Sequence, residues 1–171
     1  MNEATTRLIE GARPPVRLER QLPDPPAVVW QALTDHDQLQ AWFPCEVLVA
    51  GGHWEVGATL TFRFPPELTD VTLTGEVLAV DEPNYLAFTW GEELLRFQLH
   101  AAGSGTRLVL IDELPAGIAA RNAAGWDGCL DRLARHEGDA GAWRPRFEAY
   151  ARAFEPTLGP QVGLPPEYKG N

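Results

Sequence analysis

The longest amphipathic pattern in the chain runs from residue 116 to residue 136. Its apolar residues recur at alternating steps of four and three, which is the spacing of one stripe along an α-helix. The members of this stripe are Ala119, Ala123, Trp126, Leu130 and Leu133. Pro115 precedes the segment and Gly138 follows it, as is common at helix ends. The pattern predicts one long helix with a single apolar face.

Alternating apolar and polar residues dominate the chain before this helix, which is the pattern of strands with one buried face. A first strand is expected at 16–22. Two short helices, 26–33 and 36–43, should follow, because prolines and Asp35 stand where helices begin. Strands separated by turn residues are then expected at 45–49, 59–64, 71–80, 85–90, 94–100 and 106–113. The short turns imply antiparallel pairing.

This order of elements predicts an α+β protein in which a curved antiparallel sheet of about six to seven strands wraps around a long C-terminal helix. We expect a loose N-terminal arm (1–15), the sheet-and-helix domain (16–137) and a C-terminal extension (138–171). The extension carries an aromatic stripe at helical spacing and then a tail rich in proline and glycine. The stripe consists of Trp143, Phe147, Tyr150 and Phe154. It could dock on its own domain or form a homodimer with a second copy.

Composition narrows the classes of partner. The formal charge of −10 disfavours nucleic acid and anionic membrane surfaces. No stretch approaches the roughly 20 apolar residues of a membrane span, and the N-terminus lacks the apolar core of a signal peptide. Cys45 and Cys129 are the only cysteines, and free thiols in a reducing compartment are favoured over a disulfide. We therefore expect a cytoplasmic protein without membrane insertion.

Several short segments, in order and at matching spacing, resemble bacterial proteins related to the activator of the ninety-kilodalton heat-shock-protein ATPase. These segments are RLER (17–20), PPAVVWQALTD (25–35), LQAWF (39–43), GEV (75–77), LAFTW (86–90), TRL (106–108) and GWDGCLDRL (125–133). The resemblance covers about residues 16–136 and implies the helix-grip fold of START-type lipid-transfer domains and the birch-pollen allergen. This fold has an apolar cavity between its sheet and its helix. We do not expect the separate N-terminal chaperone-binding domain of the eukaryotic activators, so chaperone activation is not carried over.

The same arrangement indicates which side chains would line such a cavity. The candidates are Trp42, Phe43, Phe62, Phe64, Phe88, Trp90, Phe97, Asp112, Ala123, Trp126 and Leu130. The main hypothesis is a binding protein for a small hydrophobic molecule, because ligand pockets are mostly apolar with few polar groups. The alternative is that these rings form an ordinary packed core.

Two further hypotheses belong to other functional classes. One is an enzyme of cyclase or hydrolase type that uses Asp112 with His100 or Arg96 as acid–base groups. Strand alternation, however, places His100 with Arg96 on the face opposite Phe97. An inward Asp112 would need a partner such as Arg96 or His53. The other hypothesis is a protein-interaction or co-chaperone-like module acting through the acidic surface or the aromatic tail.

No sequence motif points to a metal, a cofactor or covalent catalysis. The four histidines, His36, His53, His100 and His136, do not have metal-ligand spacing with a cysteine or an acid. A GxSxG motif is absent, and the glycine pairs lack the strand–loop–helix setting of a phosphate loop. We expect no metal and no cofactor.

Overall fold

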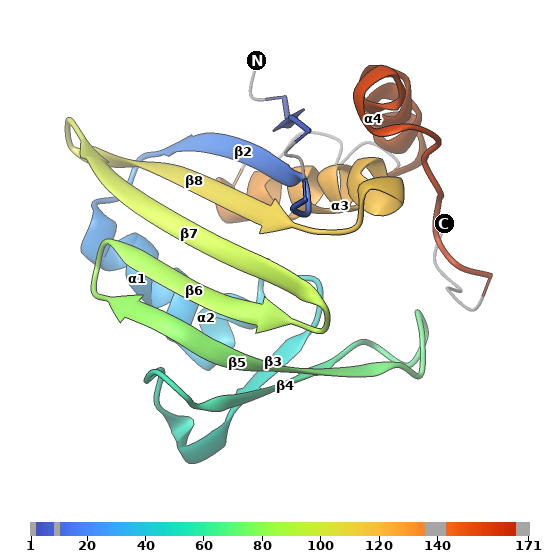
Figure 1. Ribbon diagram of the computed structural model, residues 1–171. Coiled ribbons are helices and arrows are strands. Elements are labelled where there is room, and N and C mark those ends of the chain that lie inside the picture. The colour runs from blue at the N-terminus through green and yellow to red at the C-terminus, as the bar shows by residue number, and fades with distance from the viewer. Residues whose placement is uncertain (1–2, 9–10, 136–142, 167–171) are drawn as a thin grey trace.

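The computed structural model describes residues 3–8, 11–135 and 143–166 of the chain. Its sheet has eight strands in the order β1-β2-β8-β7-β6-β5-β4-β3, and each neighbouring pair is antiparallel. The strands are β1 (Thr5–Thr6), β2 (Pro15–Leu22), β3 (Glu46–Val49), β4 (Thr59–Arg63), β5 (Thr72–Asp81), β6 (Tyr85–Trp90), β7 (Glu93–Ala102) and β8 (Gly105–Glu113). The sheet is strongly curved and twisted, with the long helix lying across it (Figure 1).

The helices take the expected places in the chain. They are α1 (Pro26–Thr34), α2 (His36–Gln40), α3 (Ala119–Leu133) and α4 (Trp143–Leu158), with short 3₁₀ turns η1 (Ala50–Gly52) and η2 (Ala116–Ile118). The α+β class and the curved sheet with a long helix after the last strand are therefore confirmed. Residues 116–118 of the expected long helix form the 3₁₀ turn η2, and α3 begins at Ala119. The helix ends at Leu133, three residues before the expected end, while His136 and Gly138 lie outside the described residues.

The strand count exceeds the expected six to seven because the N-terminal arm contributes a strand. Thr5 and Thr6 pair with Arg17 and Val16 of β2. Ala4, next to them, is buried, and its backbone N–H donates to the Tyr150 hydroxyl at 3.1 Å. The prediction of a loose arm is wrong for these residues. A strand of two residues is too short to leave a visible alternation in the sequence.

Local capping agrees with the sequence at one short helix and differs at the other. Asp35 caps α2, accepting a hydrogen bond from the backbone N–H of Gln38 at 3.0 Å. The cap position of α1 is Pro25, with no side-chain cap, while the carbonyl of Asp24 accepts from the Thr106 hydroxyl. The backbone N–H groups of Val28 and Val29 in the first turn of α1 donate instead to the carbonyl of Pro25, at 2.9 and 3.1 Å.

A glycine in β5 allows two strands to approach closely. A β-carbon at Gly75 would lie 1.9 Å from the carbonyl oxygen of Thr89 on β6 and 3.0 Å from the ring of Phe62. No side chain fits at such distances, so the position requires glycine. Gly75 therefore permits the sheet to bend around the aromatic side chains on its inner face.

The helix α4 docks on α3 through an ionic network. Arg20 of β2 is almost fully buried and pairs with Asp127 and Asp131 of α3. Arg146 of α4 contacts the same two carboxylates, at 3.1 Å to Asp127 and 2.7 Å to Asp131. Four charges of alternating sign thus join β2, α3 and α4.

Half of the aromatic stripe is buried against the protein's own chain. Tyr150 and Phe154 are buried, whereas Trp143 and Phe147 are half-buried and stack on each other with ring centroids 4.9 Å apart. This arrangement follows the intramolecular alternative for Tyr150 and Phe154. A homodimer through the remaining rings stays a prediction. The first part of the tail after α4 is held against the protein, because the backbone N–H of Val162 donates to the carbonyl of Gly117 at 2.7 Å.

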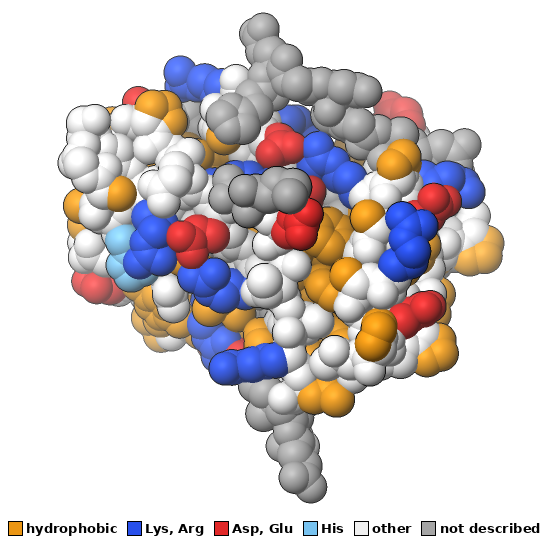
Figure 2. All heavy atoms as spheres, turned by 90° about the horizontal axis from the view of Figure 1, so that it is seen from above, with side chains coloured by type: hydrophobic (Ala, Val, Ile, Leu, Met, Phe, Trp, Pro, Cys, Tyr) orange, Lys and Arg blue, Asp and Glu red, His pale blue; other side chains and the backbone are white. Residues whose placement is uncertain are grey.

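The charged side chains above α3 and α4 are mixed in sign. Figure 2 views this face of the molecule and shows blue and red side chains next to each other, with hydrophobic side chains between them. This face therefore offers no broad patch of one charge in the part that the view leaves uncovered. None of the helices in the described residues combines the length and the apolar character that crossing a membrane requires.

Candidate functional site

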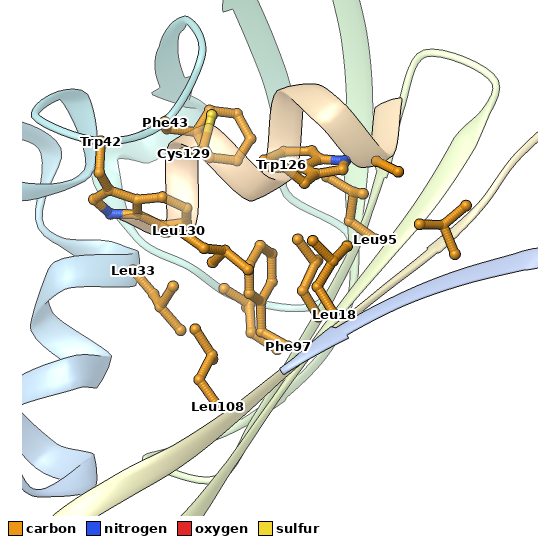
Figure 3. Close-up of a cluster of buried hydrophobic side chains, with 14 of the residues drawn as sticks. Leu18, Leu33, Trp42, Phe43, Leu95, Phe97, Leu108, Trp126, Cys129 and Leu130 are labelled. Atoms are coloured by element: carbon orange, nitrogen blue, oxygen red, sulfur yellow. The ribbon is translucent and has the colours of Figure 1, made fainter. Parts of the chain in front are cut away.

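A cluster of aromatic rings fills the middle of the space between the sheet and α3. Phe43, which follows α2, lies at its centre. Its ring centroid is 5.3 Å from that of Trp126, 6.1 Å from that of Trp90 and 6.4 Å from that of Phe62. Figure 3 shows Trp126, Cys129 and Leu130 of α3 facing Phe97 and Leu95 of the sheet, with Trp42 and Phe43 beside them. These rings contact one another directly.

The structure brings together all the residues expected to line a cavity. The buried members are Trp42, Phe43, Phe62, Phe88, Phe97, Asp112, Ala123, Trp126 and Leu130. Phe64 and Trp90 are half-buried, with ring centroids 6.1 Å apart. The centre of the set has the ring-to-ring distances of a packed aromatic core. Space for a ligand is therefore expected at the edges of the cluster rather than at its centre.

One edge of the cluster is polar. Asp112 at the end of β8 is completely buried. Its Oδ2 accepts hydrogen bonds from Trp126 Nε1 at 2.9 Å and from Asn122 Nδ2 at 3.1 Å. Asn122 also donates to Oε2 of Glu93 at 2.7 Å, so its amide bridges the two acids. The Oδ1 atom of Asp112 accepts no hydrogen bond from a nitrogen donor among the described residues.

Glu93 and Asn122 are residues that the sequence reasoning missed. Both could have been found from periodicity. Glu93 shares its strand face with Leu95 and Phe97, because alternate residues of a strand point to the same side. Asn122 lies four residues before Trp126, one turn earlier on the same side of α3. Because a buried Asp112 needs a hydrogen-bond donor, its inward direction indicated that polar partners should be sought on β7 and α3.

The carboxyl groups of Glu93 and Asp112 both have raised pKa values, so that one of them can stay protonated near neutral pH. Burial and the nearby negative charge of Asp112 together raise the pKa of Glu93 to about 8. Burial also raises the pKa of Asp112, although the hydrogen bonds from Asn122 and Trp126 oppose this shift. At neutral pH we therefore assign the proton to Glu93 and the negative charge to Asp112. A protonated Glu93 can donate a hydrogen bond to Asp112.

The acid–base pair expected between Asp112 and His100 does not form. In the antiparallel register Asp112 lies opposite Leu95, whereas His100 lies opposite Arg107, farther along β7. His100 is exposed on the outer face, as its strand alternation indicated. Two separated positions on one strand pair cannot exchange a proton directly.

The other expected partners of Asp112 are also elsewhere. Arg96 forms an ion pair with Glu113, whose side chain points away from the core, and His53 is exposed beyond the η1 turn. The prediction that Arg96 or His53 would neutralise an inward Asp112 is therefore wrong. Asn122, Trp126 and Glu93 take that place.

At the opposite edge of the cluster lies an open cleft of about 180 Å³. It is bounded by α1, the end of α2, the end of β2 and the last turn of α3. Its apolar wall is formed by Val28, Val29, Ala32, Trp42 and Leu133. Trp42 is the only expected cavity residue in this wall, and its ring centroid lies 5.6 Å from that of Phe43. The cleft therefore adjoins the aromatic cluster.

The sequence contained only a weak signal for this cleft. Val28 is an exposed valine on α1, next to the buried Val29. An exposed apolar residue is common on protein surfaces, so it marks a site only when a concave wall lies beside it.

The described residues contain no metal site of the usual kind. Across ranges 3–8, 11–135 and 143–166, no three histidine, cysteine, aspartate or glutamate side chains gather so that they could hold an ion. Cys45 and Cys129 are buried free thiols, and burial raises the pKa of Cys129 to about 11. A thiol with this pKa carries little thiolate at neutral pH and is a weak nucleophile.

The curved antiparallel sheet around a long helix, with two short helices after the first long strand, defines a helix-grip protein. The family model described as "Activator of Hsp90 ATPase homolog 1-like protein" matches residues 24–137. The chain therefore belongs to this family. No protein among those with curated descriptions matches the chain significantly.

Solved structures of similar proteins support the same fold. A conserved protein of unknown function from Enterococcus faecalis is 25% identical, with a TM-score of 0.73, over 90% of this chain and 91% of that one. The protein CalU16 from Micromonospora echinospora is 19% identical, with a TM-score of 0.67, over 92% and 97%. DynU16, a protein in the dynemicin biosynthetic locus, is 26% identical with a TM-score of 0.61, over 71% of this chain and 46% of that one.

Proposed function

We propose that the protein binds a small hydrophobic molecule in the cleft between α1, α2 and the last turn of α3. The observation that carries the proposal is the cleft of about 180 Å³ with an apolar wall that ends on Trp42. The ligand would lie at one edge of the aromatic cluster, rather than replacing the packed rings in its middle. The proposed ligand is still a small hydrophobic molecule, as expected from the sequence, but its proposed site is the cleft and not the space between the sheet and α3.

The volume limits the size of the ligand. An engineered apolar cavity of about 150 Å³ in another protein holds a benzene molecule. A cleft of about 180 Å³ therefore suits one ring or a short alkyl chain with a small substituent. Binding would remove apolar surface of the ligand and of Val28 from water, at roughly 25 cal/mol per Å².

A substitution that fills the cleft provides the test. Ala32 is half-buried in the cleft wall, and Ala27 is exposed one turn earlier on α1. Ala32→Leu should occupy the cleft, while Ala27→Leu adds the same atoms outside it. The single-ring compounds benzyl alcohol and phenylacetate are tested as ligands by ligand-observed NMR and thermal unfolding.

The expected result is that at least one of these compounds binds the unmodified protein and raises its unfolding temperature. Binding should be lost in Ala32→Leu and retained in Ala27→Leu. The proposal is overturned if none of the compounds binds, or if those that bind do so equally well to Ala32→Leu.

A further inference from the structure

We infer that the ligand of the cleft is a small carboxylic acid, with its apolar part against α1 and Trp42 and its carboxylate at the rim. This inference rests on the proposed function and adds the chemical class of the ligand. The charged residues that border the cleft are separate from the Glu93–Asp112 pair at the other edge of the aromatic cluster.

Two arginines border the cleft, one in the last turn of α3 and one just after it. Arg132 and Arg135 are exposed and line the opening, and Asp24 is the one acidic residue among the described residues that line it. The whole protein has a formal charge of −10 and only fourteen lysines and arginines. A rim with a positive balance is therefore unusual for this chain, and it favours an anionic group on the ligand.

Arg132 is held in place over the cleft. Its Nη2 donates to the carbonyl oxygen of Trp42 and to Sγ of Cys129, both at 3.1 Å. These contacts orient the guanidinium beside the ring that closes the apolar wall. A guanidinium has five N–H donors, so two contacts leave donors for a carboxylate.

Arg135 reaches the same opening because of the turn that ends α3. Its φ of 54° is in the left-handed region, which is common just after the last turn of a helix. Its backbone N–H donates to the carbonyl of Arg132 at 3.1 Å, and both residues line the cleft. A guanidinium group can bind both oxygens of one carboxylate.

The helix ends at the cleft do not add to this preference. The backbone N–H groups of Val28 and Val29 in the first turn of α1 both donate to the carbonyl of Pro25. The C-terminal end of α3, which carries a partial negative charge, borders the same cleft. The positive charge beside the apolar wall therefore comes from the two arginines. A ligand that matches both features has an apolar body and one carboxylate.

Matched ligand pairs and matched variants test the inference. Phenylacetate and 2-phenylacetamide have nearly the same shape and differ in charge, and hexanoate and hexanamide form a second pair. Dissociation constants are measured by calorimetry at low salt for the unmodified protein, Arg132→Gln, Arg135→Gln and Arg135→Lys. Arg144→Gln, an exposed arginine on α4, is the control.

We expect at least one acid to bind tenfold or more tightly than its amide. The preference should fall below threefold in Arg135→Gln, survive in Arg144→Gln and be partly restored in Arg135→Lys. Because Arg132→Gln also removes the contact with Trp42, its result counts only if its unfolding temperature is unchanged.

Failure of the inference and failure of the proposed function give different results. If amides bind as well as acids and Ala32→Leu abolishes both, the cleft binds ligand but the inference about the carboxylate is overturned. If neither member of either pair binds, both are overturned. A preference for the acid that is equal in Arg135→Gln and in the unmodified protein also overturns the inference.

Discussion

The indole nitrogen of Trp126 donates a hydrogen bond to Oδ2 of Asp112 across 2.9 Å, within the interface between α3 and the sheet. Both residues are buried, and the indole ring also contacts Phe43. The same side chain thus serves the aromatic cluster with its ring and a buried carboxylate with its N–H group. The polar contact fixes the position of α3 along β8, because a buried carboxylate without donors is costly.

Loss of this donor should destabilise the protein more than loss of a similar indole elsewhere in the cluster. Trp126→Phe leaves Oδ2 of Asp112 with one donor fewer, which costs about 1–3 kcal/mol beyond the loss of ring volume. Trp90→Phe is the matched control, because Trp90 Nε1 donates to no oxygen or nitrogen of the described residues. Chemical denaturation measures both, and equal losses would contradict the role assigned to the hydrogen bond.

Stability should fall as the pH rises towards 8, and Glu93 should account for part of the fall. Burial raises the folded-state pKa of Glu93 from 4.5 to about 8. Between these two pKa values the folded state therefore binds more protons than the unfolded state. The contribution of Glu93 to the free energy of unfolding is fully present below about pH 4.5 and is lost as the pH approaches 8.

Replacing the acid by its amide isolates this contribution. Glu93→Gln should gain stability relative to the unmodified protein at pH 8 and gain little at pH 5, as measured by thermal unfolding in both buffers. Glu92→Gln, at the exposed neighbouring position, should show no such pH-dependent difference. A pH dependence of Glu93→Gln that is identical to that of the unmodified protein would rule out the raised pKa.

Arg146 should contribute more to stability than other arginines of α4. Burial raises the pKa of Asp131, but hydrogen bonds from Arg146 and Arg20 outweigh this effect and keep the pKa below its usual value. Arg146→Ala removes one of the two arginines that pair with Asp127 and Asp131, and we expect a loss of about 1–3 kcal/mol, because these groups are partly desolvated. Arg144→Ala, exposed on the same helix, should change stability by less than about 0.5 kcal/mol. Urea denaturation compares them, and equal effects would show that α4 does not depend on this network.

Two glycine-to-alanine substitutions should have opposite effects. Gly75→Ala places a β-carbon 1.9 Å from the Thr89 carbonyl oxygen, so the strands must separate, at a cost of about 2–3 kcal/mol. Gly125→Ala in α3 meets no atom within 4 Å and should stabilise the helix by about 0.5–1 kcal/mol. Thermal unfolding checks the signs, and a stable Gly75→Ala variant would contradict the close approach of β5 and β6.

The sequence by itself determined the order of the elements and the faces of most of them. Alternation placed Leu95 and Phe97 of β7 inside and His100 outside, and the helical spacing of Ala123, Trp126 and Leu130 placed them on the sheet side of α3. These features follow from local periodicity, which depends only on the geometry of one strand or one helix. The strand β1 was not predicted, because two residues are too few to show the alternation of a strand.

Only the tertiary structure decided which side chains meet. Arg20 and Asp131 are 111 positions apart in the chain, and Glu93 and Asn122 are 29 apart. Whether the aromatic residues enclose a cavity or pack against one another depends on ring orientations, as in the 5.3 Å contact of Phe43 with Trp126. The cleft beside Trp42 likewise forms where α1, α2 and α3 diverge. Such distances are set by the packing of whole elements, and no local pattern in the sequence encodes them.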